Sequence, residues 1–229
     1  MSGVLPVALS RACRLNEYFM HRNKTYVGIM RLHKEIKEKD LREEIKKFIG
    51  KIMQLPPVRS RVKRAIRERE VFSFNILEID GKDVLFETEV QAGTYIRKIC
   101  DDMGKNLGGA HMLELRRTQA GFFKEPSYTL YDLDKAIDEY KKGNDKRLRE
   151  MLIPGESVSE LIPVLQIRKD VVKKCLTGSP IFDSFLSEPL SKDLEEGDKV
   201  AIFCGQQYIG CYNFINKNTL VAKPEFVFN

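Results

Sequence analysis

Two runs of strand-forming residues, separated by a tight turn signal, constrain the fold of this chain most. Residues 71–79 and 83–90 are both rich in β-branched and aromatic side chains, and Asp80-Gly81 lies between them. A tight hairpin needs positive φ angles, which glycine adopts without steric cost, so this dipeptide predicts an antiparallel hairpin. We therefore expect an α+β fold whose sheet is mixed and largely antiparallel.

Further strands and helices flank this hairpin. Residues 24–33 are rich in β-formers and predict a strand, and residues 111–123 predict another. The segment 40–50 has Leu41, Ile45 and Phe48 at helical spacing and stops at Gly50. A second helix with one buried face is predicted from the spacing of Ile96, Ile99, Cys100, Met103 and Leu107, and Gly108 and Gly109 end it.

The last third of the chain has a different character. An amphipathic helix is predicted over residues 130–143, followed by a polar linker that contains Pro154 and Gly155. We place a domain boundary there, between a domain of residues 1–155 and one of residues 156–229. The second domain combines a short helix over 170–178 with β-rich pieces at 199–204, 208–215 and 219–223, which predicts a small β-barrel.

Composition excludes several classes of protein. With 42% hydrophobic residues among 229, the chain can bury a core, which argues against general disorder. It has no apolar run of roughly 18 residues and no signal-peptide pattern, so the expected location is cytoplasmic. Five cysteines without a C-x-x-C pair, and three histidines, predict neither a disulfide framework nor a zinc site. The glycines form no nucleotide-binding loop.

The basic segment, residues 59–69, is the most positively charged part of a chain whose formal charge is +6. Such a concentration of Arg and Lys can neutralise several phosphates, which makes nucleic acid the expected partner. A solvated surface is the alternative, because runs of charge are common and unspecific. The six cations are Arg59, Arg61, Lys63, Arg64, Arg67 and Arg69.

The segment from Ala92 to Lys98 is the most informative about chemistry. Thr94 is a candidate cap for the helix that follows, which puts Tyr95 and Arg97 in its first turn. An arginine at a helix N-terminus lies unfavourably in the helix dipole, so an anionic partner is expected. The alternative is an exposed arginine beside a packed tyrosine. His111 is interpreted as structural, and Asp101-Asp102 as a solvated face.

Taken together, these motifs resemble the TruB-type pseudouridine synthases, in particular the archaeal and eukaryotic branch of H/ACA guide-RNA particles that includes the dyskerin relatives. The resemblance rests on five segments in the order of the family: residues 2–15, 24–33, 54–70, 89–104 and 108–125. The amino-acid sequence of the last segment is closer to that of the archaeal members. The tail from residue 167 on is similar to a PUA domain, a small RNA-binding β-barrel.

The resemblance implies roles for particular residues. A flipped uridine would stack on Tyr26, with Leu115 lining the uracil pocket. Tyr95 would assist the proton transfer from C5, and Arg97 would pair with the catalytic aspartate. Arg116 and its neighbour Arg117 would support the Leu-Arg-Arg motif that begins at Leu115, or would contact phosphate.

The family also implies how RNA is held. The basic segment, with Arg59, Arg61, Lys63, Arg64 and Arg67, would close over substrate RNA, and the PUA region around Gly178 would hold guide RNA. The expected partners are guide RNA, substrate RNA from rRNA or tRNA, and small H/ACA accessory proteins. The resemblance also implies a reaction that needs neither a cofactor nor a metal.

One departure from the family concerns the catalytic aspartate. In the family it lies in a G-T-L-D-P-type motif just before the segment that here begins at Ser2, about three positions upstream of Met1, so the expected catalytic domain is N-terminally truncated. Three explanations remain open: a start codon assigned too late, a split gene whose other product supplies the aspartate, or a non-catalytic RNA-binding or assembly protein derived from the family. A guide-independent tRNA-modifying enzyme is a further possibility.

Overall fold

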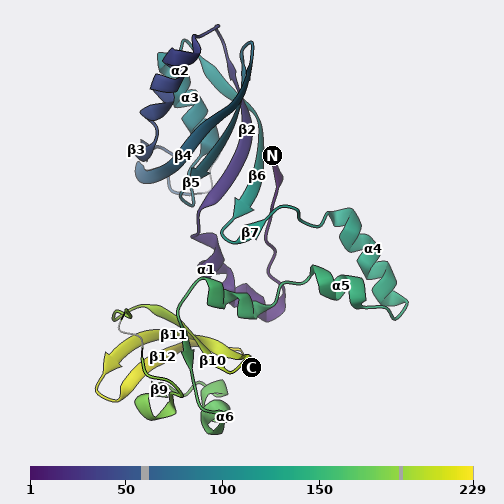
Figure 1. Ribbon diagram of the computed structural model, residues 1–229, viewed down its shortest axis with the longest axis vertical. Helices are drawn as coiled ribbons and strands as arrows, with labels where there is room; N and C mark the ends of the chain where they lie inside the picture. The colour runs from purple at the N-terminus through teal and green to yellow at the C-terminus, as the bar shows by residue number, and fades with distance from the viewer. Residues whose placement is uncertain (58–61, 191–192, 229) are drawn as a thin grey trace. The chain divides into compact units, whose positions relative to one another are not determined.

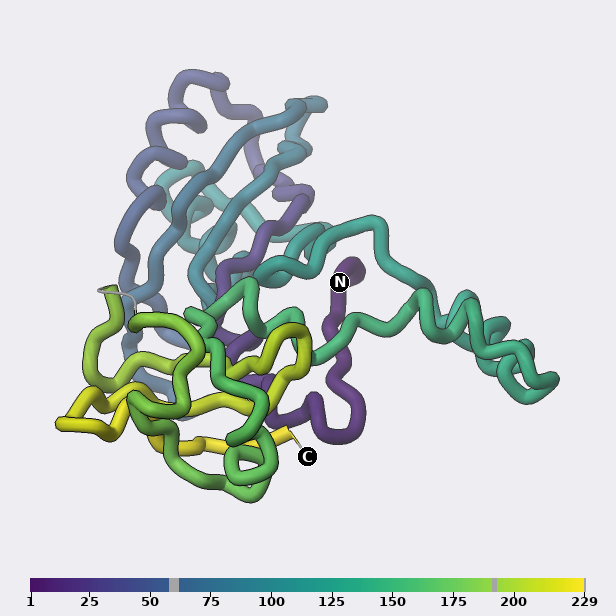
Figure 2. Tube along the Cα trace, turned by 60° about the horizontal axis from the view of Figure 1, so that its bottom comes forward, coloured from purple at the N-terminus to yellow at the C-terminus, as the bar shows by residue number. Residues whose placement is uncertain are grey.

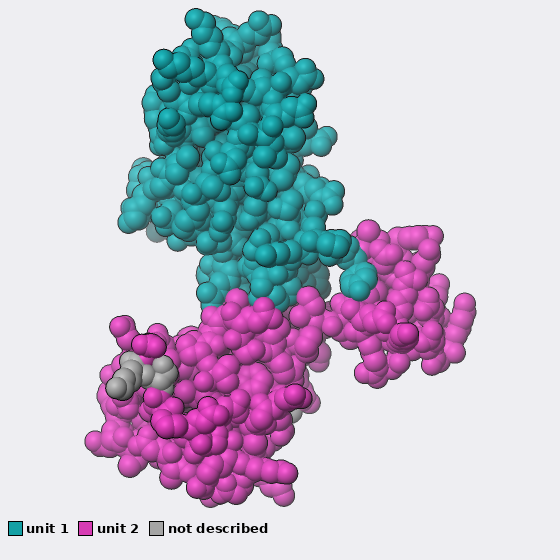
Figure 3. All heavy atoms as spheres, in the orientation of Figure 1, with its two compact units in different colours: residues 1–7, 19–128 teal, residues 8–18, 129–229 magenta. Residues whose placement is uncertain are grey.

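The computed structural model describes residues 1–57, 62–190 and 193–228. The chain divides into two compact units, coloured separately in Figure 3: unit 1 comprises residues 1–7 and 19–128, and unit 2 comprises residues 8–18 and 129–229. The boundary predicted near residue 155 lies inside unit 2 and stays a prediction of where the RNA-binding domain begins. Within the described ranges, no helix is both long and apolar enough to cross a membrane.

Unit 1 is built on a seven-stranded mixed sheet with the order β1-β6-β2-β5-β4-β3, and β7 pairs with β6 (Figure 1). All of these pairs are antiparallel except β1 with β6, which is parallel. This confirms the expected α+β class and the largely antiparallel sheet. The strands are β1 (Ser2–Gly3), β2 (Lys24–Leu32), β3 (Gly50–Gln54), β4 (Arg67–Asp80), β5 (Asp83–Val90), β6 (Ala110–Ala120) and β7 (Phe123–Lys124).

Helices α2 (Glu38–Lys46) and α3 (Ile96–Asn106) contribute to the core on one face of this sheet. The predicted apolar positions of α3 are all buried, and so are Leu41 and Ile45 of α2. They pack with alternate residues of β2 and β5, because side chains along a strand point to opposite faces. Phe74 and Phe86 stack within this core with ring centroids 4.6 Å apart. The hydrophobic face of each element therefore determines the layer in which it lies.

Local details differ from expectation where tertiary contacts decide them. The hairpin loop consists of Gly81 and Lys82, since Asp80 still pairs with Asp83, and Gly81 has the positive φ of 56°. The helix predicted over 40–50 ends at Lys46, and the strand β3 that follows was not predicted. The cap predicted at Thr94 is wrong, because the Thr94 hydroxyl donates to the Gln91 carbonyl oxygen and Tyr95 occupies the N-cap position.

Unit 2 contains a five-stranded sheet with the order β8-β10-β11-β12-β9. Its core includes fully buried Ile202, Ile209 and Tyr212. The Tyr212 hydroxyl lies 3.2 Å from the carbonyl oxygen of Cys175 and 3.3 Å from that of Ser179, so it secures the turn after α6. The elements are β8 (Val164–Gln166), α6 (Val172–Leu176), β9 (Ile181–Phe182), β10 (Lys199–Cys204), β11 (Gln207–Lys217) and β12 (Leu220–Val227).

Residues 8–18 belong to unit 2, although they lie early in the chain. Leu15 is fully buried, Arg14 donates to the Val227 carbonyl oxygen, and the Tyr18 hydroxyl donates to Glu225 at 2.6 Å. Figure 2 shows this purple segment beside the yellow end of the chain. The short helix α1 (Asn16–Met20) leads from it back to β2.

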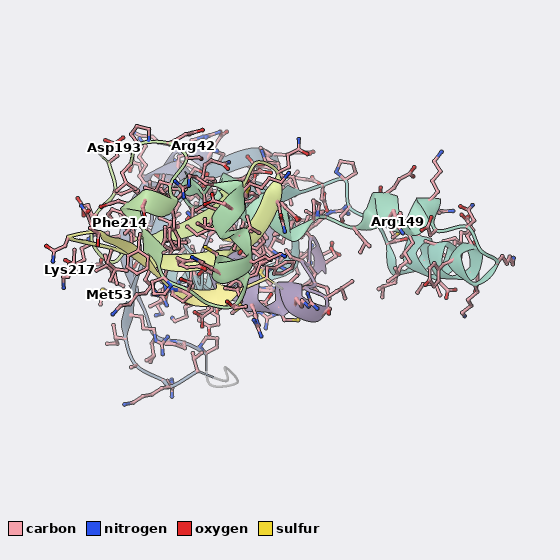
Figure 4. The ribbon with its side chains drawn as sticks, turned by 90° about the horizontal axis from the view of Figure 1, so that it is seen from below. Arg42, Met53, Arg149, Asp193, Phe214 and Lys217 are labelled. Atoms are coloured by element: carbon pink, nitrogen blue, oxygen red, sulfur yellow. The ribbon has the colours of Figure 1, made fainter. Side chains whose placement is uncertain are left out.

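Two helices of unit 2 follow unit 1 directly: α4 (Leu130–Lys141), as predicted, and α5 (Lys146–Met151), which was not. A capping box opens α4: the Asp132 N–H donates to Thr129 Oγ1, and the Thr129 N–H donates to the Asp132 carboxylate. Arg149, labelled in Figure 4, lies on α5. Its side chain donates to the Asp145 carboxylate one turn earlier. Both contacts follow the ordinary rules for helix ends and helix surfaces.

Candidate active site

Strand register brings most of the predicted site residues to one end of the unit 1 sheet. Tyr26, near the start of β2, lies opposite Thr88 of β5 and Arg117 of β6. Strand β5 ends at Val90, opposite Lys24, and the loop of residues 91–95 leads from there into α3. The first turn of α3 therefore lies at the same end of the sheet as Tyr26. Tyr26 packs against the core on the face of the sheet that α3 covers.

Tyr26 and Leu115 share that face on neighbouring strands. Leu115 lies opposite Gly28, two residues along β2 from Tyr26, and is 7% exposed. Tyr26 is half-buried at the edge of the core. A Cβ at position 28 would lie 2.7 Å from Phe86 and 2.9 Å from the Leu115 side chain. Gly28 thus provides the space that Leu115 occupies.

Tyr95 lies at a hollow formed where β3, β4 and the loop before α3 meet. Gln54, at the end of β3, accepts a hydrogen bond from the Tyr95 N–H at 3.0 Å and donates one to the Tyr95 carbonyl oxygen at 3.2 Å. Gly93 has a φ of +82° and lets the loop pass close to Arg69. The hollow is lined by Gln54, Pro56, Val62, Arg67, Arg69, Gly93 and Tyr95.

Arg97 lies in the first turn of α3 and its side chain is exposed. It takes part in none of the ion pairs formed among the described residues, so an anionic partner for it stays a prediction. Arg69, whose guanidinium lies close to Gly93, is a second unusual cation. Its Nε atom is buried and has no hydrogen-bond partner within the described parts of the chain. A buried donor of this kind favours an acceptor.

Arg117 connects the site to the beginning of the chain. Its backbone carbonyl oxygen accepts from the Val4 N–H at 2.7 Å, and its Nε donates to the Val4 carbonyl oxygen at 2.7 Å. A Cβ at Gly3 would lie 2.1 Å from the Arg117 oxygen, which leaves no room for a side chain there. Its neighbour Arg116 instead pairs with Glu125 at 2.8 Å. Arg117 thus supports the segment that begins at Ser2.

Several cations lie at this end of the sheet, where β5 also contributes Glu89 opposite Thr25. Burial, followed by the nearby charge of Arg117, lowers the pKa of Lys24. The Lys24 ammonium group donates to the carbonyl oxygens of Met20 and Arg22. Arg69, Arg97 and Arg117 lie at the same end of the sheet. An aromatic ring, an apolar wall and several cations together suit a planar base attached to a phosphate backbone.

The predicted RNA-binding residues are distributed over both units. Arg59 and Arg61 lie outside the described residues, Lys63 and Arg64 are exposed, and Arg67 lines the hollow beside Tyr95. Gly178 follows α6 in unit 2 with a φ of +91°, and apart from its chain neighbours no atom of the described residues lies within 4 Å of where its Cβ would be. Their contacts with RNA stay predictions.

The sequence reasoning missed Gln54 at this site, and it assigned Arg69 only to the basic segment and Gly93 only to the loop before the helix. Gln54 and Arg69 line the hollow, and Gly93 shapes it. The signals were available: Gln54 directly precedes the Leu-Pro-Pro motif, and Arg69 belongs to the basic segment. Neither signal could show that a strand would bring Gln54 to Tyr95, because the two are 41 residues apart in the chain.

The sequence matches two models of one protein family. Residues 1–96 match the N-terminal domain model of the TruB family of pseudouridylate synthases, and residues 97–159 match the C-terminal domain model of tRNA pseudouridylate synthase B. The chain belongs to the TruB family of pseudouridine synthases.

Similar proteins come from archaea. The chain is 42% identical over 206 residues to a probable tRNA pseudouridine synthase B of Methanopyrus kandleri, covering 89% of this chain and 61% of that protein. For the Archaeoglobus fulgidus counterpart the identity is 39%, with 89% and 63% covered. The chain thus spans less than two thirds of the length of these relatives.

Solved structures share the fold across almost the whole chain. The crystal structure of a Cbf5-Nop10-Gar1 complex matches with a TM-score of 0.89 and 36% identity, over 99% of this chain and 73% of that one. The structure of an H/ACA RNP bound to a substrate RNA containing 2'-deoxyuridine matches with a TM-score of 0.88 and 33% identity, over 99% and 72%. These matches support the expected archaeal H/ACA branch.

Proposed function

We propose that this chain forms the part of an RNA pseudouridine synthase that holds the target uridine, and that it works on guide-directed rRNA or tRNA. The observation that supports this most is the register of the unit 1 sheet. It puts Tyr26 and Leu115 on one face of the sheet, with Tyr26 near the end where α3 begins and Leu115 further along, opposite Gly28. The similar H/ACA particle, described with a bound substrate RNA, supports the same class of substrate.

The proposed roles follow the chemistry of the isomerisation. The extruded uracil stacks on Tyr26 and rests against Leu115, which recovers part of the cost of unstacking. The bond from N1 to C1' breaks, the uracil rotates, and a bond from C5 to C1' forms while the proton leaves C5 for N1. Tyr95 assists that proton transfer, and Arg97 orients the carboxylate that drives the reaction. Nothing is oxidised or reduced, so we propose no cofactor.

We propose that the carboxylate comes from a segment that precedes Met1 in the same polypeptide, or from a separate polypeptide that occupies the corresponding place. The parallel pairing of β1 with β6 supports this position, because Ser2 lies opposite Arg116 and a preceding residue would run past Leu115. The other proposed partners are guide RNA, substrate RNA and small H/ACA accessory proteins. The described structures of Cbf5 with Nop10 and Gar1 support partners of this kind.

The experiment follows tritium released from C5 of labelled uridine in a target RNA. The full chain is incubated with guide and target RNA and with a polypeptide that carries the G-T-L-D-P motif, fused before Met1 or added separately. We expect release when the motif contains its aspartate and none when that residue is asparagine. Unguided tRNA in a parallel reaction tests the guide-independent alternative.

The rival function is a non-catalytic RNA-binding or assembly protein. The exposed side chain of Arg97, which has no ion-pair partner in the described structure, leaves this alternative open. Under it, no arrangement of the upstream motif would produce tritium release, and Arg97→Ala would leave RNA affinity and cell function unchanged. That combination of results would reject catalysis and keep RNA binding.

RNA binding itself is tested through the basic segment. We predict that replacing Arg59, Lys63 and Arg64 together with glutamine weakens RNA binding. The slope of the logarithm of affinity against the logarithm of salt concentration should fall by about one for each phosphate that the segment no longer neutralises. Fluorescence anisotropy over a salt series measures the slope. An unchanged slope would show that this segment does not bind phosphate.

A further inference from the structure

We infer that Gln54 is a positioning residue for the proposed reaction. Its side-chain amide forms hydrogen bonds with the backbone of Tyr95, the residue at which the first turn of α3 begins. Its oxygen accepts from the Tyr95 N–H at 3.0 Å, and its nitrogen donates to the Tyr95 carbonyl oxygen at 3.2 Å. One amide group thus contacts both polar atoms of a single peptide residue. This inference rests on the proposed roles of Tyr95 and Arg97.

The environment of Gln54 makes this contact rigid. Gln54 is only 3% exposed, one of three buried polar or charged residues in the described parts of the chain. A buried amide needs hydrogen-bond partners, since leaving its groups unpaired costs more than a typical hydrogen bond contributes. The backbone of Tyr95 provides both partners. Moving Tyr95 therefore breaks two part-buried hydrogen bonds at once.

The start of α3 depends on this support. Tyr95 occupies the N-cap position, where Ser, Thr, Asp or Asn ordinarily accept hydrogen bonds from the first turn. Its carbonyl oxygen accepts from the N–H groups of Lys98 and Ile99 and so already belongs to the helix. Gln54 binds that same oxygen from outside. The position of the first turn, including Arg97, is thus tied to the end of β3.

The other end of the loop is fixed in a similar way. Gln91 donates its backbone N–H to the Glu70 carbonyl oxygen and accepts from the Glu70 N–H through its side chain. Between these two anchors lies Gly93, with a φ of +82°. The loop of residues 91–95 is therefore held at both ends by glutamine side chains, and Gln54 is the anchor next to the chemistry.

The length and the hydrogen-bonding groups of the side chain explain why glutamine suits the contact with Tyr95. Asparagine is one methylene shorter, which withdraws the amide from Tyr95, and methionine has similar length but can neither donate nor accept comparable hydrogen bonds. Glutamate would offer acceptors only and would bury a charge. Gln54→Met therefore removes both hydrogen bonds while keeping the volume of the side chain.

The test compares Gln54→Met with a matched control, Glu44→Met, in the full chain. Glu44 is also 3% exposed, and it accepts from Asn106 at the last turn of α3, away from Tyr95. Two measurements are made on each variant: amide hydrogen exchange of residues 95–97, and the single-turnover rate of tritium release at saturating RNA with the upstream motif supplied. Thermal melting records the decrease in stability of both.

We expect Gln54→Met to lower the single-turnover rate by about 10- to 100-fold through misplacement of the first turn. RNA affinity should stay within about threefold, because the substitution acts on the reacting groups and not on binding. Exchange at residues 95–97 should become faster. Glu44→Met should destabilise the fold without either effect. If Gln54→Met does not fold, Gln54→Asn is measured in the same way.

Two results would overturn the inference: a Gln54 variant that keeps both wild-type exchange and wild-type rate, or an equal loss of rate in Glu44→Met. Failure of the proposed function has a different signature, since the wild-type chain would then release no tritium with any form of the upstream motif. The hydrogen-exchange comparison would still decide whether Gln54 fixes the start of α3.

Discussion

The two long helices that begin at residues 96 and 130 start in opposite ways. Helix α4 opens with the capping box of Thr129 and Asp132 and an acid in its first turn. Helix α3 opens at Tyr95 with Arg97 and Lys98 in its first turn, where cations are unfavourable in the helix dipole, and it takes its support from Gln54 on a distant strand. Helix α4 follows the preferences for capping residues and for acids in the first turn. Helix α3 departs from them at the place where we propose that the charge of Arg97 takes part in the reaction.

The largest effect is expected when the first turn of α3 receives an acidic residue, as helix N-termini favour. Arg97→Glu places an acid in the first turn, which should stabilise the fold by about 0.3–1 kcal/mol. The same change should lower the isomerisation rate by about 100- to 1000-fold, since it removes the charge that orients the carboxylate. Thermal melting and tritium release measure the two effects. Arg97→Gln, as a control, should lose the rate with a smaller gain in stability.

An opposite result would be equally clear. If Arg97→Glu kept the wild-type rate, the cation at this position would have no catalytic role. If it lowered stability, the arginine would have a structural partner, and the contrast between the two helix starts would not reflect a functional compromise.

A smaller effect is expected from breaking the rules at α4. Thr129→Ala removes the side chain that caps the helix and should destabilise the fold by about 1 kcal/mol. The rate of tritium release should be unchanged, because we assign Thr129 no part in the site. Urea denaturation gives the decrease in stability. A fall in rate comparable with that of the Gln54 variants would contradict the assignment.

The smallest effect is expected from lowering the pH of the solution. Hydrogen bonds from the side chain and backbone of Thr129 lower the pKa of Asp132 below its usual value near 3.8. Its contribution is thus fully present above that value and is lost as the pH falls through the lower, folded-state pKa. The hydrogen-exchange protection factors at the start of α4, which correct for the pH dependence of intrinsic exchange, should decrease below about pH 4 by more than those at the start of α3. Asp132→Asn should remove this dependence on pH.

Much of the fold could be predicted because hydrophobic spacing is a local property. Strand β2, the hairpin of β4 and β5, and the buried face of α3 follow from patterns within a dozen or so residues. Strand β3 and helix α5 were missed, because Gly50 was interpreted only as a helix stop and residues 146–151 as part of a polar linker. These elements are short and depend on the neighbours that they pack against.

The candidate site was predictable only in part. Tyr26, Tyr95, Arg97 and Leu115 were selected from the resemblance to the family. Tyr26 and the start of α3 lie at one end of the sheet, and Leu115 lies further along it, opposite Gly28. Gln54 was missed because a buried amide acts through the backbone of a residue far along the chain. Thr94 was expected to cap α3 by its residue type, but its hydroxyl donates to Gln91 instead.

The close approach of Gly3 to Arg117 has a practical consequence for protein engineering. Position 3 cannot carry an affinity-tag junction, a cloning scar or a cysteine for a fluorophore, since any side chain there would collide with the Arg117 carbonyl oxygen and detach β1. Leu5 and Val7 are 73% and 71% exposed, so labels belong there. A fluorophore at either position would report on how β1 is seated without disturbing it.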